Sequence, residues 1–96
     1  MEYIIENQFL RVTVISKGAQ IKSVVRKSDG VEHMWNGNPD IWGYHSPVMF
    51  PYAGKVTGNT LEIRGQKVEN VPQHGFHRTM EHDFVEQTED SVTFAI

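Results

Sequence analysis

The 96-residue chain contains no cysteine, which excludes disulfide bridges and zinc sites built on thiolates. It also lacks any apolar run close to the roughly 20 residues that a membrane-spanning helix needs, so no membrane partner is expected. Its longest apolar runs are Tyr3–Ile5, Val48–Phe50 and Phe94–Ile96. Glu2 and Glu6 stand where a secretory signal peptide would carry basic residues. These absences lead us to expect a cytoplasmic protein.

Basic residues are too few for us to expect a nucleic-acid partner. Nine lysines and arginines stand against twelve aspartates and glutamates, which gives a formal net charge of -3. A nucleic-acid-binding surface needs a basic stripe that displaces counterions from phosphates. Hydrophobic residues make up 39% and charged residues 22% of the chain, as in an ordinary folded domain. Length and composition together predict a single domain over residues 1–96 with no internal boundary.

Apolar side chains alternate with polar ones along much of the chain, which is the period of β-strands. Leu10, Val12 and Val14 fall on one face of an extended segment, and Leu61 and Ile63 repeat the pattern. Turn-forming residues separate these segments, and no amphipathic helix is found. The pattern predicts an all-β fold, an antiparallel sandwich or barrel. The expected strands are residues 2–6, 9–16, 20–27, 31–35, 60–64, 67–70, 84–87 and 91–96.

The turn at Gly65 and the segment Ser91–Ile96 each lead to a further structural prediction. Gly65 suits the first central position of a type II′ hairpin turn, because glycine accepts a positive φ at little cost. The segment Ser91–Ile96 ends in an apolar side chain, without the charge or proline that usually protects an exposed edge. Either this edge pairs with another chain, giving self-association through the C-terminal strand, or the sequence is the front part of a larger sheet protein.

The densest group of chemically capable side chains runs from Gln73 to Arg78. Ordinary loop histidines, hydrogen bonded or solvated, are one interpretation of this group. A second is a metal site, since His74, His77 and Glu81 faintly resemble the two-histidine and glutamate motif of cupin barrels. The two histidines stand three positions apart, so they would face opposite sides of a regular strand. We therefore expect no metal.

A carbohydrate site is the third interpretation. Hexoses present many hydroxyl groups and weakly polar C–H faces, so their sites combine aromatic platforms with imidazole and guanidinium donors. The irregular, aromatic segment Asn36–Val56 is either a packed loop or a wall of such a site. Taken singly, each aromatic residue is more often part of a core than a platform. The side chains of the required kinds are Trp35, Trp42, Tyr44, His74, Phe76 and Arg78.

Three blocks of the sequence carry a family resemblance. They are residues 35–42, residues 46–55 with the motif FP-x-x-G, and residues 72–78 with the motif Q-H-G-F-x-R. In this order the blocks resemble the aldose 1-epimerase (galactose mutarotase) family, and its LacX-like branch in particular. The resemblance covers the whole chain. It implies an antiparallel β-sandwich, the galactose mutarotase supersandwich, of which this chain would be the N-terminal part.

The family interconverts the α and β anomers of a free aldose, without a cofactor. A base removes the proton of the anomeric hydroxyl, an acid protonates the ring oxygen, and the opened sugar recloses on either face. The resemblance implies that His74 is catalytic, because it matches the family histidine that binds the sugar and polarises the ring oxygen. The family's second histidine and its glutamate come from later strands and match no residue of this sequence.

The resemblance also implies contacts to the aldose substrate. Lys55 stands where family members usually carry an arginine, and lysine keeps the charge without the bidentate fork. The other substrate-binding residues implied are Gln73, Phe76, Arg78 and Trp42. The alternative function is a non-catalytic carbohydrate-binding or structural β-module.

Overall fold

The computed structural model describes residues 1–96, which form eight β-strands and two short 3-10 helices. The strands are β1 (Glu2–Glu6), β2 (Leu10–Ile15), β3 (Gln20–Arg26), β4 (Val31–Glu32), β5 (Leu61–Ile63), β6 (Gln66–Val68), β7 (Asp83–Gln87) and β8 (Val92–Ala95). The helices are η1 (Thr57–Asn59) and η2 (His77–Thr79). Each strand expected from the alternating pattern is present, but the one expected at residues 31–35 covers only Val31 and Glu32. Neither helix is long and apolar enough to cross a membrane.

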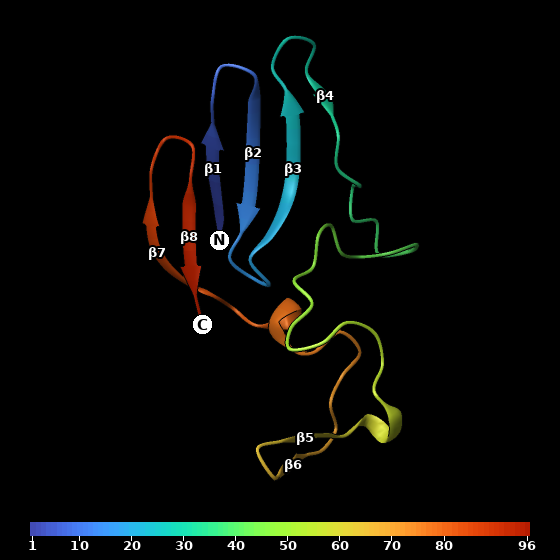
Figure 1. Cartoon of the computed structure of the whole chain (residues 1–96). Helices are drawn as coiled ribbons and strands as arrows, with labels where there is room; N and C mark the ends of the chain where they lie inside the picture. The colour runs from blue at the N-terminus through green and yellow to red at the C-terminus, as the bar shows by residue number, and fades with distance from the viewer.

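Strands β1 to β4 form one antiparallel sheet in the order of the chain (Figure 1). The register of β1 and β2 pairs Glu2 with Ile15. The register of β2 and β3 shifts between Thr13 and Val14, which leaves Lys22 of β3 without a facing residue. Such a bulge bends the strand locally and increases its twist. The shift lies near Gln20, at the start of β3.

The β7–β8 hairpin lies beside β1 (Figure 1). The ring of Tyr3 stacks on Phe84 with centroids 5.1 Å apart, and meets Phe94 edge-on at 5.2 Å. The backbone N–H of Glu6 donates a 2.8 Å hydrogen bond to the carbonyl of Glu89. Aromatic pairs of this kind stabilise packing beyond the area they bury. These contacts join the end of the described chain to its first strand.

The turn of the β5–β6 hairpin differs from the prediction. Ile63 pairs with Gln66, so Arg64 and Gly65 are the two central residues of the turn. Both have positive φ, 50° and 78°, which is the type I′ pattern. The prediction of a type II′ turn with Gly65 in the first central position was therefore wrong. The reason is that β6 begins at Gln66, one residue earlier than the alternation suggests.

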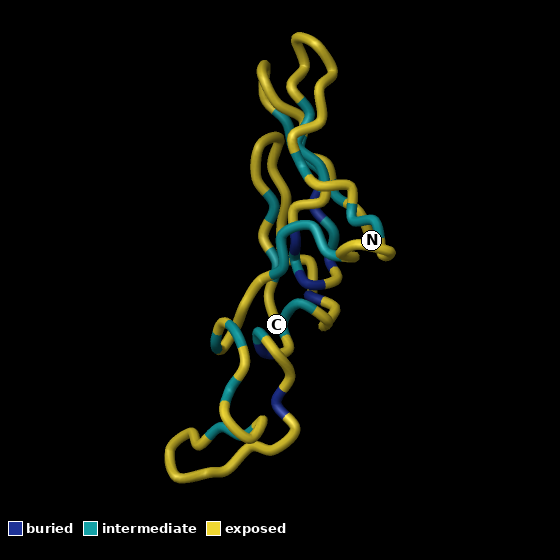
Figure 2. The backbone as a smooth tube through the Cα atoms, turned by 90° about the vertical axis from the view of Figure 1, so that its right-hand side faces the viewer, coloured by how far each residue is buried: buried dark blue, intermediate teal, exposed yellow.

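Only seven of the 96 residues are buried (Figure 2). The buried hydrophobic residues are Val14 and Val71, with exposures of 7% and 4%. The radius of gyration is 16.1 Å, whereas a compact chain of this length would have about 12.5 Å. Four of the seven buried residues lie from the end of β2 to the start of β3: Val14, Ser16, Gly18 and Gln20. The N–H of the buried His82 donates to the carbonyl of Ser16. The other two, Val71 and Gly75, lie beside Asn59 and Phe50. The expectation of a single domain stays a prediction.

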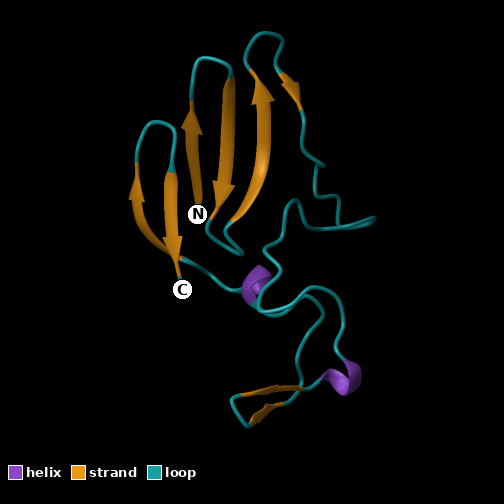
Figure 3. Ribbon diagram, viewed as in Figure 1, coloured by secondary structure: helices purple, strands orange, loops and turns teal.

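Residues 36–56 form a long loop between β4 and β5 (Figure 3). Phe50 makes an isolated parallel bridge with Gly75, and no strand forms in this loop. The loop thereby runs beside the segment that carries His74. It brings the FP-x-x-G motif next to the Q-H-G-F-x-R motif.

Candidate functional site

His74 is held against Gly54 by two hydrogen bonds. The backbone N–H of His74 donates to the carbonyl of Gly54 at 2.8 Å, and the N–H of Gly54 donates to Nδ1 of the imidazole at 2.7 Å. Because Nδ1 accepts a hydrogen bond, the single ring proton of the neutral imidazole resides on Nε2. The half-buried ring of His74 therefore presents an N–H donor at its outer edge.

The close approach of the two loops requires a glycine at position 75. A Cβ atom on Gly75 would overlap the carbonyl of Phe50, and its φ of 74° favours glycine in any case. His74 itself has a φ of 64°, which is uncommon for a residue with a side chain. Strained backbone of this kind gathers at functional sites. The strain at His74 is therefore a structural reason to look for function here.

A hollow of about 360 Å³ lies beside the loop that carries His74. Lys55, which follows Gly54, and Gln73, which precedes His74, both line it. The amide nitrogen of Gln73 lies 3.4 Å from Nε2 of His74. The remaining lining residues are Asn59, Asn70, Val71 and Pro72. The structure therefore brings together three of the predicted site residues, one imidazole, one ammonium and one amide.

The three residues of the cupin-like metal alternative are not gathered in one place. The ring of His77 packs against Phe50 at 4.7 Å and against His82 at 5.4 Å, and Glu81 accepts a hydrogen bond from the hydroxyl of Ser16. No group of three or more histidine, aspartate or glutamate side chains is arranged to hold a metal ion. Neither a carboxylate nor a second imidazole is hydrogen bonded to His74.

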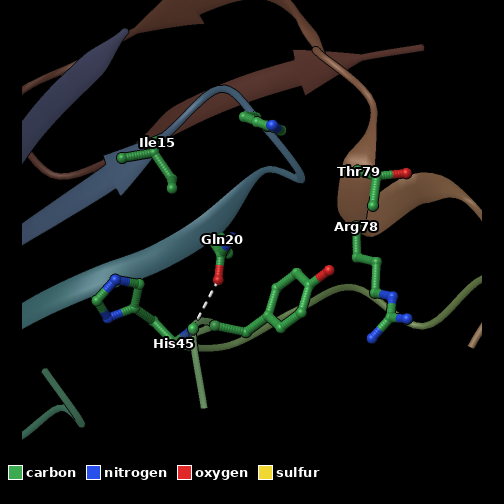
Figure 4. Close-up of a pocket in the computed structure, with 8 residues that line it drawn as sticks. Ile15, Gln20, His45, Arg78 and Thr79 are labelled. Atoms are coloured by element: carbon green, nitrogen blue, oxygen red, sulfur yellow. Dashed lines mark hydrogen bonds between the residues drawn. The ribbon is translucent and has the colours of Figure 1, made fainter. Parts of the chain in front are cut away.

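Arg78 lines a different hollow, of about 430 Å³ (Figure 4), and Trp42 contacts one of its lining residues, Tyr44. The guanidinium carbon of Arg78 lies 4.8 Å from the centroid of the Tyr44 ring, and the Trp42 ring lies 5.9 Å from that of Tyr44. This second hollow shares no lining residue with the hollow beside His74. It is lined by Ile15, Lys17, Gln20, Gly43, Tyr44, His45, Arg78 and Thr79.

The aromatic residues suggested as sugar platforms keep exposed faces. Trp35, Trp42 and Phe76 are 38%, 46% and 38% exposed. The indole N–H of Trp35 donates to the carbonyl of Trp42 at 2.7 Å, which orders the loop between them. Tyr44 also lines the second hollow, so the loop of residues 36–56 forms part of the wall of that hollow.

Several groups at the candidate site could not be identified from the types of residue in the sequence. The group on Gly54 that orients the imidazole is a backbone N–H, which every residue except proline carries. Asn59 and Asn70 line the hollow beside Lys55, and their φ angles of 53° and 56° place them in turns. Asparagine tolerates that conformation, so sequence alone suggests turn residues rather than ligand contacts.

The comparison with known sequences agrees with the geometry. The model of the aldose 1-epimerase family matches residues 1–96. Protein LacX of Lactococcus lactis subsp. lactis, in its plasmid and chromosomal forms, is 32% identical over 96 residues, covering 96% of this chain and 32% of LacX. The chain thus spans about a third of the length of the curated relatives it matches.

Two solved structures share the fold and confirm its type. A galactose mutarotase related enzyme from Lactobacillus acidophilus superimposes with a TM-score of 0.91 and 37% identity, covering 98% of this chain and 31% of that one. A galactose mutarotase-like protein from Lactobacillus casei ATCC 334 gives a TM-score of 0.89 and 30% identity, covering 98% and 32%. The chain is therefore all-β and antiparallel, with the galactose mutarotase-like fold, and it belongs to the aldose 1-epimerase family.

Proposed function

We propose that this chain contributes to an aldose 1-epimerase site, in which it binds a free hexose and polarises the ring oxygen. Membership of the family supports the reaction, and the hydrogen bond from Gly54 to Nδ1 of His74 is the observation that carries the role. The bond fixes the ring proton on Nε2, so His74 can donate to a sugar oxygen. A donor fixed before the substrate arrives needs no reorganisation during the reaction.

The tautomer of His74 limits what the imidazole does. In ring opening, the electrons of the anomeric O–H bond form the aldehyde C=O, and those of the C1–O5 bond move to the ring oxygen O5. A hydrogen bond from Nε2–H stabilises the charge that develops on O5. Full transfer of that proton would leave an imidazolate while Nδ1 still accepts from Gly54. We therefore assign His74 the polarising role, and the protons are moved by other groups.

The residues of the neighbouring hollow would hold the sugar. The ammonium of Lys55 donates to hydroxyl oxygens, and the amide of Gln73 both donates and accepts. Together they match the alternating donors and acceptors of a hexose. Phe76, Trp42 and Arg78 stay proposed substrate contacts, and the rings of Phe76 and Trp42 have exposed faces for such a contact.

The proposal is tested on the full 96-residue chain with ¹⁵N-labelled imidazoles and fresh α-glucose or α-galactose. Saturable sugar-dependent shifts are expected at the His74 ring and the Gly54 amide. The shift at the Gly54 amide should vanish in His74→Gln, and both shifts should persist in His33→Gln, a matched change at an exposed histidine. Polarimetry should show at most a small acceleration of mutarotation, because an acid–base partner normally supplies about 10²–10⁴-fold. Absence of any shift at His74 would refute the proposal.

A second candidate function follows from the surroundings of His74. No carboxylate lines the hollow beside it, which favours a carbohydrate-binding module without turnover. The same polarimetry separates the two functions. Saturable binding with a rate equal to that of the buffer supports the binding module. A rate typical of an enzyme, lost in His74→Gln, supports the epimerase and would show that the acid and base are present in this chain.

A further inference from the structure

Cationic side chains of the chain divide into paired and unpaired sets. The residues that form an ion pair with a glutamate or aspartate are Arg11, Lys22, Arg26, Lys27 and Lys67. The residues without such a partner are Lys17, Lys55, Arg64 and Arg78. Two of the unpaired residues, Lys17 and Arg78, line the same hollow of about 430 Å³. Two positive charges thus converge on one space with no carboxylate in its lining.

The Tyr44 ring positions the guanidinium of Arg78, but one N–H group of that guanidinium has no hydrogen-bond acceptor. Its carbon lies 4.8 Å from the centroid of the Tyr44 ring, a cation–π arrangement that restrains the plane of the fork. Its Nε–H is buried and has no acceptor in the chain. Buried donors are nearly always paired in folded proteins, so one without a partner needs an explanation. A ligand that brings oxygen atoms to the guanidinium would supply it.

The side-chain amide of Gln20 offers a further donor to the hollow. The amide oxygen of Gln20 already accepts from the backbone N–H groups of His45 and Ser46, at 2.9 and 3.2 Å, so its NH₂ group is left to donate (Figure 4). Gln20 therefore adds a donor to the two positive charges of the hollow, which suits a ligand rich in acceptors.

From these observations we propose that the hollow of Lys17 and Arg78 binds an oxyanion, a phosphate or carboxylate group. The planar fork of an arginine matches two oxygens of such a group, and an exposed lysine adds a point charge at the mouth. Because this hollow shares no lining residue with the one beside His74, it is a second site. The anion is either free or carried by the hexose, and the latter case rests on the proposed function.

The test is a titration of the full ¹⁵N-labelled chain with inorganic phosphate. Saturable shifts are expected at Lys17, Gln20 and Arg78. Arg78→Gln should weaken phosphate binding by about tenfold or more, the value of a charge-assisted hydrogen bond. Lys17→Gln, at an exposed position where folding is not at risk, should weaken it about two- to fivefold.

Arg64→Gln is the matched control, because Arg64 is also unpaired but lies in the exposed turn of the distant β5–β6 hairpin. Its phosphate affinity should equal that of the unaltered chain. Equal weakening by Arg64→Gln and Lys17→Gln would show non-specific attraction and overturn the site. Absence of saturable shifts at the lining residues would overturn it as well.

The source of the anion is decided by comparing inorganic phosphate, glucose 6-phosphate and glucose. Tighter binding of glucose 6-phosphate than of phosphate, with shifts at His74 as well as Arg78, supports an anionic sugar. Equal affinities with shifts at Arg78 alone support a free oxyanion. The two proposals fail separately: glucose without effect on His74 refutes the sugar site, and phosphate without effect on Arg78 refutes the oxyanion site.

Discussion

Nδ1 of His74 accepts a 2.7 Å hydrogen bond from the backbone N–H of Gly54, twenty residues earlier in the chain. The bond joins the two sequence motifs that carry the family resemblance. Since the donor is a backbone group, the orientation of the imidazole depends on the path of the loop rather than on a neighbouring side chain. The orientation of the His74 ring is therefore coupled to the packing of residues 50–54 against residues 74–75.

The tautomer of His74 is the first prediction. We expect a proton on Nε2 and none on Nδ1, since Nδ1 accepts from Gly54. His82 is an internal control, because its Nδ1 lies 3.1 Å from the carbonyl of Met80 and must carry a proton to bond it. A two-bond ¹H–¹⁵N correlation spectrum distinguishes the two forms. Protonated Nδ1 in His74 would contradict the geometry of the site.

Gly75→Ala should separate the two loops. The new Cβ would overlap the carbonyl of Phe50 at a φ of 74°, and the cost should be about 2–5 kcal/mol. Gly30→Ala is the control, since Gly30 has a φ of 71° and no atom within 4 Å of the added Cβ, so only about 1–2 kcal/mol is expected. Urea unfolding and amide exchange at His74 measure both. Equal costs would mean that the close approach does not matter.

Tyr3→Leu should loosen the β7–β8 hairpin from β1. The substitution removes the stacked contact with Phe84 and the edge contact with Phe94, together worth about 1–3 kcal/mol. Amide hydrogen exchange should quicken in β7 and β8 while β2 and β3 keep their protection. Uniform acceleration across all strands would instead indicate that the rings hold the whole chain together.

Glu6 should make the first sheet sensitive to acid. Its pKa lies below the ordinary value of 4.5, chiefly because of the hydrogen bond from Arg11 and then because of Lys27. A lowered folded pKa means that the stabilisation is present above pH 4.5 and is lost as the pH falls through the folded value. Arg11→Gln should raise the ¹³C titration midpoint of Glu6, and Lys67→Gln, whose partner is Glu69, should not. An unchanged midpoint in Arg11→Gln would contradict the assignment.

Self-association through the C-terminal strand stays a prediction. Ile96 is 55% exposed beyond the end of β8, and apolar edges of this kind recruit further strands. Ile96→Lys should shift sedimentation velocity profiles toward the monomer. Ile41→Lys, at a 72% exposed residue of the long loop, should leave association unchanged. A chain that sediments as a monomer at high concentration would disprove the prediction.

The alternation of polar and apolar residues was enough to predict the eight strands, because it is a local property of extended backbone. It did not determine the turn at Gly65, since the turn type depends on which residues of the two strands pair. The local alternation of residues could not show that β6 begins at Gln66, one residue before the predicted start.

The sequence also showed which residue types could form a site, but it did not show which of these residues lie together in space. Lys55 and Gln73 share a hollow beside His74, while Arg78, four residues after His74, faces Tyr44 across a different one. Spacing along the chain says little about which hollow a loop residue faces, because the backbone reverses direction at residues of positive φ such as His74 and Gly75. The orientation of the imidazole by a backbone amide could be seen only in the folded chain, since nearly every residue type carries that amide.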